Sequence, residues 1–72
     1  MSTAEFDPVE HDADLAWELY EAQPTHPEIP RLAQRVLAAR PERSGMRILL
    51  AQHHEALGDL AEARRILHDL VG

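Results

Sequence analysis

Four segments of the chain carry apolar residues at intervals of three and four positions, the spacing of an amphipathic helix. Stretches that contain proline or glycine separate them near residues 23–28, 41–44 and 58–59. The pattern predicts four helices between Pro8 and Leu70. The turns between them are short, so each helix is expected to lie antiparallel to the next.

The first helix has the clearest start. Asp7 can cap its free amides, Pro8 suits its first turn, and Glu10 lies three residues after the cap. The helix is expected to run to about Ala22 and to stop at the two prolines within residues 23–27. Its apolar surface is wider than one stripe requires, which predicts two contacts for this helix.

The second helix is expected to begin between Pro27 and Pro30, to reach about Arg40, and to end at Pro41. Its apolar stripe consists of Ile29, Leu32, Ala33, Val36 and Leu37.

Ser44 is the expected cap of the third helix. The stripe of that helix consists of Met46, Leu49, Leu50, His53 or His54, and Leu57. Gly58 is expected to close it in a left-handed conformation.

The fourth helix follows the capping-box sequence Asp59-Leu60-Ala61-Glu62. Its apolar stripe consists of Leu60, Ala63, Leu67 and Leu70, flanked by Ile66 and Val71. Ala51 and Ala63 are small where the last two helices must approach closely. The side chains expected to fill the seam between these helices are Leu50, Leu57, Leu60 and Leu67.

The helical pattern recurs along the chain. A shift of 34 residues aligns residues 31–37 with residues 65–71, and a shift of 35 pairs Leu15-Ala16 with Leu50-Ala51. A helical period of 34 residues is typical of tetratricopeptide repeats, and the second half resembles one. The positions that carry the resemblance are Pro41, Arg47, Leu50, Ala51, His54, Gly58, Asp59, Ala63 and Leu67. Arg47 and His54 stand where the family has aromatic residues, and Pro24 replaces a glycine in the first turn.

The resemblance implies an all-α fold of two antiparallel helix-turn-helix hairpins in a right-handed stack, and a protein-binding role as adaptor or scaffold. A plain four-helix bundle is the alternative fold. The predicted organisation is a flexible tail over residues 1–7 and one domain over residues 8–72. That domain comprises one repeat at residues 8–41 and another at residues 42–72.

The amino-acid composition limits the classes of partner that the chain is expected to bind. The chain has 72 residues, no cysteine and a formal charge of −6. Nucleic acids and anionic membranes need clustered cations, so we expect neither as a partner. Residues 1–23 hold seven acids and no Arg or Lys, which is either a solvated face or a docking face for a basic partner. The first residues lack a cationic, apolar leader and no stretch is long enough to cross a membrane, so we expect a cytoplasmic protein.

Catalytic chemistry is not indicated. The five histidines include no pair three or four residues apart, and there is no His-Glu-x-x-His sequence, so no metal site is expected. His54 is expected to pack in the family's aromatic position. The three glycines form no phosphate-binding loop. We therefore expect no catalytic residue, no cofactor and no enzymatic activity.

The binding sites expected from the sequence are sites for other proteins. Trp17 and Tyr20 either pack over the second hairpin or form an anchor within an acidic rim. The apolar residues Ile66, Leu67, Leu70 and Val71 nearly encircle the last turn without a polar helix to cover them. The last helix is therefore expected to meet another chain, with Ile66, Leu70 and Val71 as its contact residues. The partner is another protein or a second copy. The alternative functions are an accessory or regulatory subunit of an enzyme complex and a homodimeric helical bundle.

Overall fold

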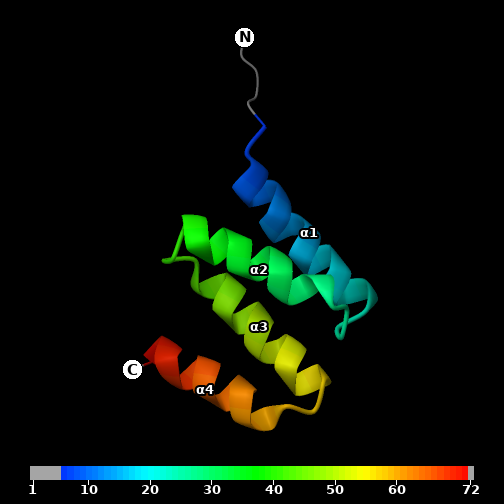
Figure 1. Cartoon of the computed structure of the whole chain (residues 1–72), viewed down its shortest axis with the longest axis vertical. Coiled ribbons are helices and arrows are strands. Elements are labelled where there is room, and N and C mark those ends of the chain that lie inside the picture. The colour runs from blue at the N-terminus through cyan, green and yellow to red at the C-terminus, as the bar shows by residue number, and fades with distance from the viewer. Residues whose placement is uncertain (1–5, 72) are drawn as a thin grey trace.

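The computed structural model describes residues 6–71, and side chains as far as Asp69. It contains the helices α1 (Pro8–Ala22), α2 (Glu28–Ala39), α3 (Ser44–Ala56) and α4 (Leu60–Val71), and no strand within residues 6–71. α1 pairs with α2 and α3 with α4, while α3 also lies against α2 (Figure 1). The all-α fold of two hairpins is therefore confirmed. Most of the expected tail, residues 1–5, lies outside the described residues, and the division at residue 7 stays a prediction.

The helix ends follow the local chemistry of the sequence. The Asp7 carboxylate accepts the amide N–H of Val9 at 3.0 Å, which caps α1 as expected. Gly58 ends the α3 segment with φ of +85°, and the Asp59 carboxylate accepts the Glu62 amide at 3.3 Å. These contacts confirm the predicted caps at both places.

The predicted cap at Ser44 is wrong. Ser44 is already the first residue of α3, and Arg43 occupies the cap position without a side-chain capping bond. The Arg43 guanidinium instead reaches Glu10 of α1. A side-chain contact between distant segments is therefore found where α3 begins, beside the local backbone hydrogen bond from the Met46 amide to the Arg43 carbonyl at 3.1 Å.

The core lies between the helices of both hairpins and is built from small and aliphatic side chains. Its buried hydrophobic residues are Ala13, Ala16, Ile29, Leu32, Ala33, Val36, Met46, Leu49, Leu50, Ala51, Ala63 and Ile66. Leu15, Leu19 and Tyr20 of α1 are partly buried against it. Since α1 contacts both α2 and α3, the two contacts predicted for this helix are present.

The expected filling of the α3–α4 seam is only partly correct. Ala51, Ala63 and Leu50 are buried, but Leu57 is 53% exposed, Leu60 58% and Leu67 41%. Ile66 takes the inner position on α4 and is 8% exposed. With 3.6 residues per turn, Ile66 and Leu67 point about 100° apart, so a helix that turns Ala63 and Ile66 inward turns Leu67 outward.

Candidate protein-binding surfaces

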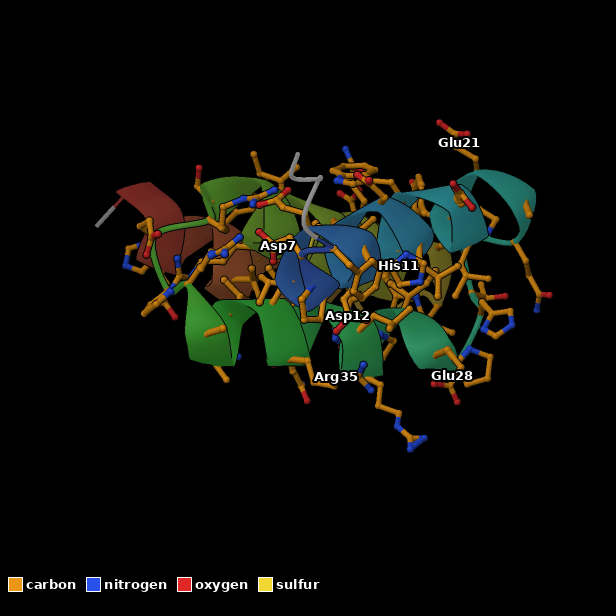
Figure 2. The ribbon with its side chains drawn as sticks, turned by 90° about the horizontal axis from the view of Figure 1, so that it is seen from above. Asp7, His11, Asp12, Glu21, Glu28 and Arg35 are labelled. Atoms are coloured by element: carbon orange, nitrogen blue, oxygen red, sulfur yellow. The ribbon has the colours of Figure 1, made fainter. Side chains whose placement is uncertain are left out.

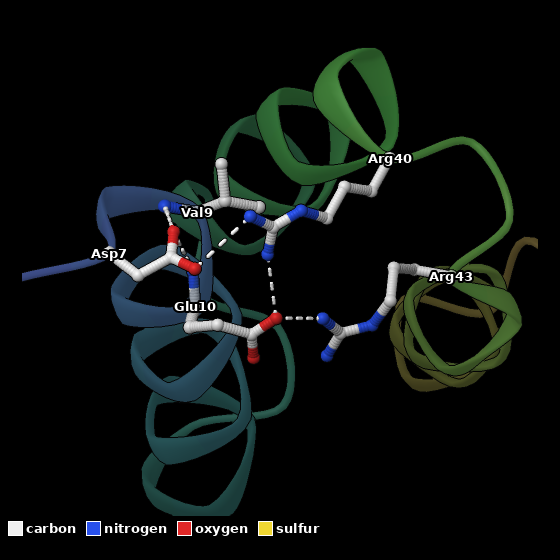
Figure 3. Close-up of polar contacts among 5 residues, drawn as sticks. All are labelled: Asp7, Val9, Glu10, Arg40 and Arg43. Atoms are coloured by element: carbon white, nitrogen blue, oxygen red, sulfur yellow. Dashed lines mark hydrogen bonds and ion pairs between the residues drawn. The ribbon is translucent and has the colours of Figure 1, made fainter.

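An ion cluster joins the first helix to the turn that connects the hairpins. Arg40 donates to Asp7 at 3.1 Å and to Glu10 at 2.8 Å, and Arg43 donates to the same Glu10 carboxylate (Figure 3). The two arginines flank the turn between α2 and α3. The cluster therefore holds the start of α1 against the turn that joins the two hairpins. It thereby fixes the orientation of α1 relative to that turn.

The cluster changes the protonation of Asp7. The hydrogen bond from Arg40 lowers the pKa of Asp7 below its ordinary value of 3.8, and the amides of Glu10 and Val9 add to this effect. A carboxyl group whose pKa is lower in the folded chain stabilises the fold above the unfolded pKa. That contribution disappears as the pH falls through the folded pKa.

This linkage predicts the behaviour of Asp7→Asn. Asn keeps the helix cap but loses the charge, so we expect a lower melting temperature than wild type near neutral pH. The two proteins should converge as the pH falls below 3.8. Thermal unfolding followed by circular dichroism across this range measures the difference. Asp14→Asn, at an exposed carboxylate on the same helix, is the control. A pH-independent difference between Asp7→Asn and wild type would contradict the linkage.

The rest of α1 presents carboxylates to solvent. Asp14, Glu18 and Glu21 are exposed and recur at helical spacing, so they share one face of the helix. In Figure 2, Glu21 points away from the ribbon, whereas Asp12 faces Arg35 of α2. The Asp12 carboxylate accepts a hydrogen bond from Arg35 at 2.9 Å and thereby joins α1 to α2. The acidic face, defined here as Asp14, Glu18 and Glu21, is therefore a distinct surface.

Trp17 lies at the border between the acidic face and the side of α1 that packs inward. Its side chain is 36% exposed. Tyr20 packs against the core, and the two rings meet edge to face with their centres 6.2 Å apart. The structure thus brings together the two aromatic residues singled out in the sequence, and it holds the indole partly open to solvent.

The two neighbouring histidines of α3 have different surroundings. His53 is 2% exposed, and its Nδ1 lies 2.8 Å from the carbonyl oxygen of Pro24. Since a carbonyl oxygen only accepts, the Nδ1–H donates and ties α3 to the α1–α2 turn. His54 is half-buried, with its Nδ1 3.7 Å from an Asp59 carboxylate oxygen. The stripe of α3 therefore runs through His53, the first of the two alternatives left open.

Sequence reasoning missed the hydrogen bond between His53 of the second hairpin and the Pro24 carbonyl of the first. The signal was present, since His53 lies seven residues after Met46 and four after Leu49 on the buried stripe. His54 occupies the family's aromatic position but keeps part of its ring in solvent.

One of the three residues of α4 that were expected to contact another chain does not lie at the surface. Ile66 belongs to the core, so it is not exposed to a partner. Leu70 and Val71 have side chains outside the described residues. Among the described side chains of α4, the large apolar ones that are exposed are Leu60 and Leu67, both of which the sequence assigned to the seam with α3.

The described residues contain no group of three or more His, Asp or Glu side chains placed to hold a metal ion. None of the helices in this part of the chain is long and apolar enough to span a membrane. The candidate protein-binding surfaces are the aromatic and acidic side of α1 and the exposed leucines of α4.

Comparison with known proteins gives one family. A family model described as tetratricopeptide repeat matches residues 10–72, nearly the whole chain. The chain therefore belongs to the tetratricopeptide repeat family, whose members are in general modules of protein–protein interaction. Neither the curated proteins nor the solved structures that were searched contain a match.

Proposed function

We propose that this protein is a small cytoplasmic adaptor or scaffold that binds other proteins, needs no cofactor and has no catalytic activity of its own. The family supports the general role. The proposed contact residues are Trp17 and Tyr20 on α1, together with Leu70 and Val71 at the end of α4. Through the last helix the chain would meet another protein or a second copy.

The observation that carries the proposal is the indole of Trp17 beside the acidic face. A half-exposed aromatic ring flanked by exposed carboxylates suits an arginine or lysine side chain, which can lie over the ring and meet the carboxylates. Tryptophan and tyrosine side chains often carry much of the binding energy of protein interfaces. We therefore take a basic segment of another protein as the partner of α1.

Trp17 is the sole tryptophan, so its fluorescence reports on this surface directly. We expect an oligo-arginine peptide to change the emission of Trp17 in a saturable manner, and the affinity to fall as salt is added because exposed charges are screened. An uncharged peptide of equal length should leave the emission unchanged. If the oligo-arginine peptide also leaves it unchanged, α1 is not the docking surface.

A pair of charge reversals locates the binding. Glu18→Arg lies on the acidic face and should weaken peptide binding about fivefold. Glu42→Arg changes the net charge equally, at an exposed position in the turn before α3, and should have a much smaller effect. Equal losses in both variants would mean that the peptide responds to net charge alone, which contradicts a defined site on α1.

A further inference from the structure

A groove with two exposed leucines lies on the second hairpin. It has a volume of about 330 Å³ and is lined by Glu55 of α3 and by Leu60, Ala63, Arg64 and Leu67 of α4. Leu60 is 58% exposed and Leu67 41%. Among the described helices, α4 contacts α3 alone and lies at one end of the stack (Figure 1). No second described helix therefore covers these leucines.

The first hairpin shows what covers the corresponding positions there. A shift of 34 residues pairs Leu32 with Ile66 and Ala33 with Leu67. Leu32 and Ile66 are buried to the same degree, at 6% and 8% exposed, because α1 covers α2 as α3 covers α4. Ala33 is 0% exposed, whereas Leu67 is 41% exposed. The difference follows from one further neighbour of the first hairpin, since α3 also lies against α2.

The face of α3 that meets the first hairpin indicates which kind of helix fits such a groove. His53 bonds to the Pro24 carbonyl of the first hairpin. Met46 and Leu49 lie seven and four residues before it, so they share its face of the helix, and all three are buried. Positions i, i+3 and i+7 are those with which an amphipathic helix fills a groove. A helix with apolar residues at this spacing would cover the two leucines of α4.

A second copy of this chain does not offer such a helix in the same arrangement. At the shift of 35 residues, the positions of α1 that correspond to this face of α3 are His11, Asp14 and Glu18, and all three are exposed. If α1 of another copy stacked on α4, it would place two carboxylates among the leucines. Stacking on α4 therefore calls for a helix of a different protein.

Two charges add a preference that the first hairpin lacks. Glu55 and Arg64 line the groove at positions where the first hairpin has Tyr20 and Pro30. Neither Glu55 nor Arg64 forms an ion pair with a described side chain. The two helices that line the groove thus offer opposite charges, Glu55 from α3 and Arg64 from α4. A partner is complementary if its apolar stripe has a basic residue toward α3 and an acidic residue toward α4.

We propose that the groove formed by Glu55, Leu60, Ala63, Arg64 and Leu67 binds an amphipathic helix of another protein. The apolar residues of that helix stand at positions i, i+3 and i+7, with a basic residue toward Glu55 and an acidic residue toward Arg64. The inference rests on the proposed protein-binding function and deepens it, because it names the partner of the last helix. This ligand differs in its chemistry from the basic segment proposed for α1.

Two labelled helical peptides test the charges by fluorescence anisotropy. Both have leucines at positions i, i+3 and i+7 and lysines along one border of that stripe. The other border holds glutamates in the first peptide and glutamines in the second. With the first peptide, Arg64→Glu and Glu55→Arg should each weaken binding about fivefold. With the second peptide, the loss from Glu55→Arg should remain and the loss from Arg64→Glu should disappear.

A second pair of variants tests the apolar part of the groove. Leu67→Glu should abolish binding of both peptides, whereas His68→Glu, at the adjacent exposed position, should retain it. A control peptide of the first composition, with its leucines spread around the helix, should not bind the wild-type protein. Circular dichroism confirms that each variant is folded and that each peptide is helical.

The inference is overturned if the wild-type protein does not bind the first peptide at high micromolar concentration, or binds the control peptide equally well. Equal losses from Arg64→Glu with both peptides would contradict the acidic contact. Binding of the first peptide should leave the emission of Trp17 unchanged, and none of these results bears on the oligo-arginine titration. The proposed binding function of α1 therefore stands or fails separately.

Discussion

Leu49→Ala is expected to lower the free energy of unfolding by about 3 kcal/mol. Leu49 is fully buried in α3, among the largest enclosed side chains of the core, which also include Ile29, Val36 and Met46. Truncation removes apolar contact and leaves a cavity that rigid helices close only in part. In a chain of 72 residues that loss is a large share of the total stability.

Urea unfolding followed by far-ultraviolet circular dichroism measures this loss. Leu57→Ala makes the same change at the end of α3, on a side chain that is 53% exposed, and should cost well under about 1 kcal/mol. If both variants lose equal stability, the core is not centred on α3 as the structure has it. If the protein is a dimer, both variants must be compared at one chain concentration.

The sequence predicts the helices because their boundaries depend on neighbouring residues. Asp7 caps α1 through amides two and three residues away, and Gly58 adopts the left-handed conformation that only a residue without a side chain takes easily. The prolines near residue 24 likewise end α1 through their effect on adjacent residues. Such signals are read directly from the chain, and the two hairpins follow from the short turns that they define.

The orientation of α4 is not local, and here the prediction was wrong. Ile66 and Leu67 are both large and apolar, so helical periodicity alone gives no reason to choose which one faces α3. The burial of Ala63 decides it, because a helix that turns Ala63 inward turns Ile66 inward with it. Leu67 is thereby left 41% exposed at the surface.

The contacts that join the hairpins were equally hidden from the sequence. Glu10 meets Arg40 and Arg43 across 30 or more residues, and His53 meets the carbonyl of Pro24 across a similar interval. No spacing rule connects such partners. Both contacts depend on how the second hairpin sits on the first, and they become visible only when the helices are in place. The pairing of Trp17 with Tyr20 could be predicted, because residues three positions apart on a helix lie next to each other.

Ala51→Leu is expected to destabilise the protein by about 1–3 kcal/mol through overpacking. Ala51 is 1% exposed in the middle of α3 and belongs to the hydrophobic core. A leucine there has no free volume, so either its rotamer is strained or the two helices move apart. Separation would also expose Ile66, which adds the loss of apolar burial to the strain.

The matched control is Ala38→Leu, at an exposed position of α2. Leucine and alanine differ little in helix propensity, so this variant should unfold within about 0.5 kcal/mol of wild type. A stable Ala51→Leu variant would mean that the hairpins tolerate a wider helix spacing than the structure has.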